Sequence, residues 1–204
     1  MIYLCRIQES PDPSAYLRRC RLLNMDKPYG KASWVSQCGW LLLRYALLRE
    51  YGLDFACQTV AVTPYDKPYF ADLREIHFNI SHSRGMAAVV LDKEPVGIDI
   101  QKIMAYKENL ARRICSHVEW EWLSQAEDKA KTLYTFWAMK ESYVKYTGLG
   151  LRCGLKTIPY LPHAVVYGAA EGYALSVCSE KKVNRQVCFV PEEVLERRIE
   201  PLNI

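Results

Sequence analysis

Three charged side chains lie close together in one short apolar segment, residues 136–145. Lys140, Glu141 and Lys145 occur there among aromatic and aliphatic residues at helical spacing, and Gly148 is a typical helix terminator. Glu141 and Lys145 are four residues apart, so they are neighbours on the helix surface, either as a weak exposed ion pair or as part of a polar site. The predicted helix has one stripe of residues that share a face: Leu133, Trp137, Lys140 and Val144.

A second polar pair, Asp99 and Gln101, lies upstream in the segment 96–101. Aliphatic residues alternate there with Gly97, Asp99 and Gln101, which is the period of a half-buried β-strand. The two polar side chains therefore project from one face, and Gly97 leaves room for a ligand or another backbone to approach closely. Their oxygens, together with the Glu141 carboxylate, suit a hard cation such as Mg²⁺, which takes further ligands from water and substrate phosphates. Taken alone, a strand aspartate is more often a solvated edge residue.

A cluster of hydrogen-bond donors lies at the end of another predicted strand, residues 76–81. Ser81, His82 and Arg84 follow one another closely there, and strand ends of this kind commonly bind phosphate oxygens. Lys67 lies in a turn-rich loop upstream. Together these residues favour an anion site, although His82 alone would serve equally well as a partner of its own local backbone.

The composition indicates a globular chain, because 50% of its 204 residues are hydrophobic and 25% are charged. The net charge of +4 favours an acidic protein or a phosphate-bearing ligand, and no long basic block points to nucleic acid. The 8 cysteines show no zinc spacing, and neither a signal segment nor a membrane-spanning stretch is evident. We therefore expect a cytoplasmic protein with no nucleic-acid partner and no membrane partner.

The predicted elements divide into two parts of similar make-up. A turn-rich stretch separates residues 1–95 from residues 96–204, and each part holds strands, helices and a hairpin-like pair. We therefore expect an α+β fold of two pseudo-symmetric halves. Ser33 and Gly52 mark the ends of the first long helix, and residues 192–199 predict a terminal helix whose charges are solvated. The expected strands are residues 2–7, 55–62, 76–81, 86–91, 96–101, 164–167, 173–178 and 187–190.

These motifs, in this order, resemble the signature of the 4′-phosphopantetheinyl transferases. The stretches 96–100 and 136–145 look like the two motifs that define the family, and the stretches 67–69 and 78–83 look like additional motifs of its surfactin-type branch. Together they cover roughly residues 65–150. The resemblance implies a monomer of two α+β halves with the site between them, similar to two fused copies of the shorter, trimeric holo-acyl-carrier-protein synthase.

The resemblance also implies an activity. The phosphopantetheine arm of coenzyme A would be transferred to a serine of an apo acyl, peptidyl or polyketide carrier protein, and adenosine 3′,5′-bisphosphate would be released. The serine hydroxyl attacks the β-phosphorus of a pyrophosphate, which requires neutralised charge and aligned reactants. The sequence does not indicate which carrier is served.

The resemblance assigns roles to the polar residues of both segments. Asp99 and Glu141 are implied as Mg²⁺ ligands, and Glu141, or a water held by the metal and a carboxylate, as the acceptor of the serine proton. Lys145 would neutralise the phosphate, and Lys140 would either stabilise the same charge or position the helix. Gln101 occupies a position where many members of the branch have glutamate, so we expect it to bind Mg²⁺ more weakly, directly or through water.

Coenzyme A contacts are implied for the N-terminal half. Ser81 and His82 match family positions that hold coenzyme A phosphates, and Lys67 matches a position near the nucleotide. The family often has an arginine shortly before the position of Gly39, and that arginine is missing here. The candidates to replace it as a ligand of the 3′-phosphate are Arg19, Arg21, Lys27 and Lys31.

Two other functions are open at this point. Gln101 and the missing arginine would also suit a catalytically weak module that binds coenzyme A or a carrier protein without transferring the arm. A Mg²⁺-dependent nucleotide hydrolase would break down coenzyme A without any carrier, but no motif singles out an attacking water. A transfer assay with labelled coenzyme A and an apo carrier distinguishes the three functions.

Overall fold

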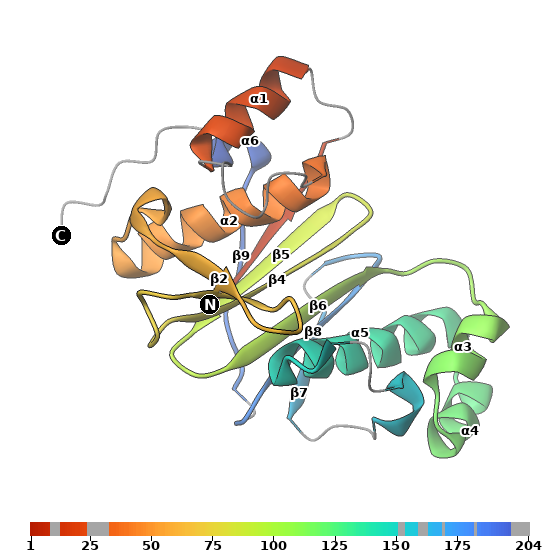
Figure 1. Cartoon of the computed structure of the whole chain (residues 1–204). Helices are drawn as coiled ribbons and strands as arrows, with labels where there is room; N and C mark the ends of the chain where they lie inside the picture. Colours follow the sequence, from red (N-terminus) through yellow and green to blue (C-terminus); the bar gives the residue numbers. More distant parts are fainter. Residues whose placement is uncertain are drawn as a thin grey trace.

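The computed structural model describes residues 1–8, 13–23, 33–150, 154–158, 163–168, 170–181 and 183–196 (Figure 1). These residues form two halves, each with one long helix packed on the outer face of a mostly antiparallel sheet. The α+β class expected from the sequence is therefore confirmed. Within the same residues, no helix has both the length and the apolar character needed to cross a membrane.

The N-terminal half is built on one four-stranded sheet. Its strands are β1 (Ile2–Arg6), β4 (His77–Ser83), β5 (Met86–Asp92) and, from the far end of the chain, β9 (Val187–Phe189). Their order in the sheet is β4-β5-β1-β9, antiparallel except for the parallel pair of β1 with β9. The strand expected over residues 55–62 is shorter in the structure, because a turn of 3₁₀ helix precedes it. The small elements of this half are η1 (Phe55–Cys57), β2 (Val60–Val62) and β3 (Pro68–Phe70).

The long helix α2 (Trp34–Tyr51) covers the outer face of this sheet, and α1 (Pro13–Leu22) packs beside it (Figure 1). Ser33 caps α2 by accepting a hydrogen bond from the Ser36 amide. Gly52 ends the helix in the left-handed conformation, at φ 68°. Both ends lie where the sequence predicts them, and the apolar face of α2 forms the larger core with the sheet.

The C-terminal half repeats this arrangement with different elements. Its elements are β6 (Val96–Lys102), α3 (Glu108–Ile114), α4 (His117–Gln125), α5 (Lys129–Thr147), η3 (Leu155–Thr157), β7 (Ala164–Tyr167) and β8 (Tyr173–Ser179). The three strands form an antiparallel sheet in the order β6-β8-β7, and α5 packs on its outer face. A second apolar core, made by aliphatic residues of β1, β5, β6 and β8, lies between the inner faces of the two sheets.

Side chains of β4, rather than backbone pairs, join the two sheets. Asn79, Ser81 and Ser83 alternate along β4, and each accepts a hydrogen bond from a backbone amide of β6. The pairs are Asn79 Oδ1 with Ile98 N at 2.9 Å, Ser81 Oγ with Ile100 N at 3.2 Å and Ser83 Oγ with Lys102 N at 3.0 Å. This ladder fixes β6 against β4, so that Ser81 lies beside Asp99 where the halves meet.

The last described segment of the chain returns to the N-terminal half. β9 pairs with β1, and α6 (Glu192–Leu195) packs against α2. Residues 187–196 therefore complete the first sheet and its helical layer. The predicted assignment of all of residues 96–204 to the C-terminal half does not hold for this segment.

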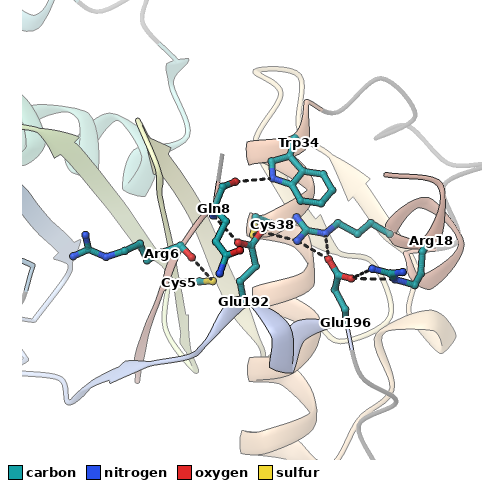
Figure 2. A network of polar contacts seen from close by, with 9 residues as sticks. Cys5, Arg6, Gln8, Arg18, Trp34, Cys38, Glu192 and Glu196 are labelled. Carbon is teal, nitrogen blue, oxygen red and sulfur yellow. Dashed lines mark hydrogen bonds and ion pairs between the residues drawn. The ribbon is translucent and has the colours of Figure 1, made fainter. Parts of the chain in front are cut away.

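Buried ion pairs anchor the returning segment, as Figure 2 shows. Glu192 accepts hydrogen bonds from Arg19 Nη2 and from the Gln8 amide, both at 2.6 Å. Arg19 also pairs with Glu196, and its guanidinium lies 3.3 Å from the centre of the Trp34 ring. Arg19 is 1% exposed and Glu192 is 7% exposed, so the expectation that the charges of the terminal helix are solvated is wrong for Glu192.

Replacing Arg19 by methionine is expected to lower the free energy of unfolding by about 3 kcal/mol, because Glu192 then remains buried without a cationic partner. Urea unfolding followed by circular dichroism measures the change. Arg112→Met is the matched control, since Arg112 forms an exposed pair with Glu108 four residues away and should change stability by no more than about 0.5 kcal/mol. Equal stability of the Arg19 variant and the unmodified chain would contradict the anchor.

Candidate active site

Strand β6 directs alternate side chains into two different layers. Its aliphatic residues enter the core between the sheets, whereas Gly97, Asp99 and Gln101 face the side covered by α5. Both faces are buried along most of the strand, so it is more enclosed than predicted. A Cβ atom at residue 97 would stand 2.1 Å from Ser142 O and 2.3 Å from Tyr146 N. The predicted close approach at Gly97 is therefore confirmed, and the approaching group is the backbone of α5.

Asp99 is the centre of a buried polar cluster. It is 2% exposed, and its Oδ1 accepts hydrogen bonds from Ser81 Oγ at 2.8 Å and from Lys145 Nζ at 2.7 Å. Its Oδ2 accepts a hydrogen bond from Gln101 Nε2 at 2.8 Å, and Lys145 also donates to Ser81 Oγ at 2.9 Å. Because the Lys145 ammonium offsets the charge of the Asp99 carboxylate, a buried carboxylate is tolerated here. The cluster ties β4, β6 and α5 together.

Glu141 interacts electrostatically with this cluster. Burial raises the pKa of the Glu141 carboxyl above its ordinary value, and the negative charge of Asp99 raises it further. Trp137 Nε1 donates a hydrogen bond to Glu141 Oε1 at 3.3 Å, and this bond opposes the rise in pKa together with the charges of Lys145 and Arg113. The structure thus brings the strand carboxylate and the helix carboxylate within electrostatic reach of each other.

Asp99 and Gln101 of β6 and Glu141 of α5 form the junction between the strand and the helix. Their oxygen atoms fit a hard divalent cation such as Mg²⁺. Asp99 and Glu141 contribute carboxylates whose mutual repulsion a bound cation would relieve, and Gln101 contributes an amide oxygen. No group of three or more His, Cys, Asp or Glu side chains with metal-binding geometry occurs in the described part of the chain. Mg²⁺ commonly takes few ligands from a protein and the others from water and substrate oxygens.

A pocket of about 310 Å³ lies beside this junction and is lined by residues of both halves. Glu141 and Lys145 of α5 line it, together with Lys67 from the loop before β3. Lys67 Nζ donates hydrogen bonds to Tyr146 O at 3.0 Å and to Val96 O at 3.3 Å, and burial lowers the pKa of Lys67 to about 8. The wall thus combines two lysines with the carboxylates of Asp66 and Glu141, and the lysines suit an anionic group of a ligand.

The comparisons with known proteins identify the family of the chain. A family model described as the 4′-phosphopantetheinyl transferase superfamily matches residues 95–185. A 4′-phosphopantetheinyl transferase of Bacillus subtilis is 34% identical over 160 residues, which span 69% of this chain and 71% of that protein. This chain belongs to the 4′-phosphopantetheinyl transferase family.

Two further matches were found for this transferase. The 4′-phosphopantetheinyl transferase Sfp of Bacillus subtilis (strain 168) is 35% identical over 127 residues, which span 61% of this chain and 57% of that protein. The crystal structure of Thermotoga maritima holo-[acyl-carrier-protein] synthase matches 44% of this chain and 64% of that chain, with a TM-score of 0.38 and 18% identity.

Lys140 of the transferase does not line the pocket, although Glu141 follows it directly. Lys140 is 2% exposed, and its ammonium group donates hydrogen bonds to Glu119 Oε2, Ile114 O and Leu155 O. The resemblance left two roles open for Lys140, charge stabilisation and positioning of the helix. The geometry favours positioning.

Ser81 and His82 occupy successive positions near the end of β4, but they differ in surroundings. Ser81 is buried and bonded to Asp99 and Lys145, so it belongs to the central cluster. His82 is exposed. Partial burial of its ring and, to a smaller extent, the positive charge of Lys145 lower the pKa of His82 below its ordinary value.

The structure contradicts the role predicted for Arg19 as a ligand of the 3′-phosphate. Its guanidinium is buried and fully engaged by Glu192 and its neighbours, so a phosphate cannot reach it. Arg21 is exposed near the end of α1. Lys27 and Lys31, the other candidates, lie outside the described residues.

Two contacts of the motif residues, Trp137 with Glu141 and Glu119 with Lys140, were missed by the sequence analysis. Trp137 precedes Glu141 by four residues, and this helical spacing was an available signal for their contact. Glu119 follows Ser116 at the spacing of a capping box, and both reciprocal bonds of the box are present at the start of α4. Nothing in that local pattern identifies Lys140 as the third member of the group.

Proposed function

We propose that this transferase moves the phosphopantetheine arm of coenzyme A to a serine hydroxyl of an apo carrier protein. The reaction is Mg²⁺-dependent and releases adenosine 3′,5′-bisphosphate. The observation that carries the proposal is the junction where Asp99 of β6 and Glu141 and Lys145 of α5 meet beside a pocket lined by both halves. Family membership supports a carrier protein as the acceptor, and the net charge of +4 suits an acidic partner.

In the proposed reaction, the carrier serine oxygen forms a bond to the β-phosphorus, and the bond from that phosphorus to the bridging oxygen breaks. Glu141, or a water held by the metal and a carboxylate, would accept the serine proton. Lys145, held by Asp99 and Ser81, supplies positive charge beside the phosphate. Mg²⁺, held by Asp99, Glu141 and the Gln101 amide oxygen, directly or through water, would neutralise and align the pyrophosphate.

We propose that the coenzyme A pyrophosphate binds where the pocket meets the central cluster. Lys67 and Lys145 contribute positive charge to the pocket wall, and His82 provides a hydrogen-bonding group at the adjacent strand end. Ser81, whose hydroxyl is bonded to Asp99, Lys145 and the Ile100 amide, would act by holding Lys145 in place. The pocket contains residues of β4 and of α5 from the same chain, which supports a site that is complete in a monomer. We place the reaction in the cytoplasm.

The test is an assay with fluorescent coenzyme A, Mg²⁺ and a panel of apo carrier proteins from fatty-acid, polyketide and non-ribosomal peptide systems. We expect Mg²⁺-dependent label on at least one carrier, and labelling about 10²- to 10⁴-fold slower with Glu141→Gln, the matched control for the carboxylate. Coenzyme A binding without label on any carrier would indicate a binding module instead. Breakdown of coenzyme A in the absence of a carrier would indicate a hydrolase.

Replacing Gln101 by glutamate is expected to lower the Mg²⁺ concentration for half-maximal rate by about tenfold, because it adds a charge at the proposed metal site. Without Mg²⁺ the same variant should melt at a lower temperature, since residue 101 loses its hydrogen bond to Asp99 and repels that carboxylate. Thermal melts with and without Mg²⁺ therefore give a readout independent of activity. Gln125→Glu, an identical change at the exposed end of α4, is the control. A higher Mg²⁺ requirement in the Gln101 variant would count against residue 101 at the metal.

A further inference from the structure

Glu119 and Lys140 form a buried ion pair on the side of α5 that faces α3 and α4. Each side chain is 2% exposed, and Lys140 Nζ lies 2.7 Å from Glu119 Oε2. The same ammonium donates to Ile114 O at 2.6 Å and to Leu155 O at 2.9 Å. A lysine ammonium has three N–H donors, and these three acceptors use all of them. No donor is left for a phosphate.

The three acceptors belong to three separate segments. Ile114 is the last residue of α3, Glu119 lies in the first turn of α4, and Leu155 begins η3. Glu119 Oε2 also accepts a hydrogen bond from the Ser116 amide at 2.7 Å, so one carboxylate oxygen both caps α4 and binds α5. The ammonium therefore fixes three chain segments to one point on α5.

That point is next to the residue proposed to take the serine proton. Successive residues of an α-helix point about 100° apart, so Lys140 enters the layer of α3 and α4 while Glu141 faces the Asp99 junction. On its other side α5 rests on the bare backbone of Gly97. Rotation of α5 about its axis would move Glu141 relative to Asp99, and the buried pair opposes this rotation.

We infer that Glu119 and Lys140 are positioning residues, which set the orientation of α5 and thereby of Glu141, and that the Lys140 ammonium takes no part in the charge stabilisation of the transferred phosphate. This inference rests on the proposed function, because it concerns the rate of arm transfer. It makes Glu119, which lies outside the pocket, a determinant of that rate.

The experiment compares Lys140→Met, Glu119→Gln and the double variant Lys140→Met with Glu119→Gln. Each is assayed for transfer per folded molecule, with the folded fraction taken from circular dichroism. Lys140→Met leaves the Glu119 carboxylate buried without a cation, and we expect kcat to fall about 100-fold with KM for coenzyme A unchanged. The double variant is neutral and keeps an oxygen acceptor for the Ser116 amide. We expect it to recover kcat to within about tenfold of the unmodified enzyme.

A folded double variant that stays as slow as Lys140→Met would overturn the inference, because the ammonium itself would then be required. Should Lys140→Met not fold, Glu119→Gln alone decides, since it keeps the ammonium and its two carbonyl partners. We expect its kcat to fall about tenfold at unchanged KM, and an unchanged kcat per folded molecule would overturn the inference.

The unmodified enzyme separates this inference from the proposed function. If it labels no carrier, the proposed function fails, and hydrogen exchange of the α5 amides then tests the pair without any substrate. Lys140→Met should lower protection along α5 and the double variant should restore it. Equal protection in the unmodified chain and in Lys140→Met would overturn the positioning role.

Discussion

Replacing Asp99 by asparagine is expected to lower the transfer rate about 10³-fold while the chain stays folded. Asparagine keeps the size of the side chain and an oxygen that accepts the hydrogen bond of Ser81. It removes the negative charge that attracts the Lys145 ammonium, which lies 2.7 Å away. It also removes one of the two carboxylates, with Glu141, of the proposed metal site. The carrier-labelling assay gives the rate, and circular dichroism reports whether the fold is retained.

Glu141, the second carboxylate of the proposed site, is tested by its replacement with glutamine. Glu141→Gln keeps an acceptor for the Trp137 indole, so the fold should be unaffected, but it removes the proposed proton acceptor. We expect a loss of about 10²- to 10⁴-fold in rate. Glu121→Gln, an exposed change of the same type on α4, should leave the rate as it was. Near-normal turnover of a folded Asp99 or Glu141 variant would refute the site.

The sequence predicted the central junction because its two elements have regular periods. The twofold period of β6 puts Asp99 and Gln101 on one face, and the helical period of α5 puts Glu141 one turn from Lys145. The structure confirms that Asp99 and Gln101 share a face and that Lys145 reaches it. That β6 and α5 meet at all was implied by the family resemblance, since no local pattern specifies a contact between distant segments.

The position of Lys140 was partly readable from the sequence. It shares a stripe with Leu133, Trp137 and Val144, and a lysine on an otherwise apolar stripe must find a partner when it is buried. The structure buries Leu133, Lys140 and Val144, leaves Trp137 half-buried, and supplies Glu119 as the partner of Lys140, 21 residues away in the chain. The family motif suggested that the charge of Lys140 acts on the phosphate, whereas the apolar stripe indicated that the Lys140 side chain is buried. The stripe was the better guide.

The return of the C-terminal segment was not predictable from local patterns. Glu192 and Arg19 are 173 residues apart, and each lies in an ordinary amphipathic setting. Residues 192–199 were predicted to form a helix with solvated charges, because short charged segments at chain ends are usually exposed to solvent. Only the three-dimensional pairing of β9 with β1 reveals that these charges are buried. The same pairing removes Arg19 from the candidates for phosphate binding.

Replacing Gly97 by alanine is expected to lower the free energy of unfolding by about 3 kcal/mol. A methyl group at residue 97 would stand 2.1 Å from Ser142 O and 2.3 Å from Tyr146 N. Both are backbone atoms inside α5, so neither can rotate away as a side chain would. The helix as a whole would have to move off the strand.

That movement would separate the two elements that form the site. Glu141 and Lys145 travel with α5, whereas Asp99 stays in β6, so we expect transfer per folded molecule to fall about 100-fold in addition to the loss of stability. Urea unfolding and the labelling assay measure the two effects. Gly168→Ala is the control, because a Cβ at residue 168 meets no atom within 4 Å. If Gly97→Ala matched Gly168→Ala in stability and rate, the close contact between β6 and α5 would not be what holds the carboxylates together.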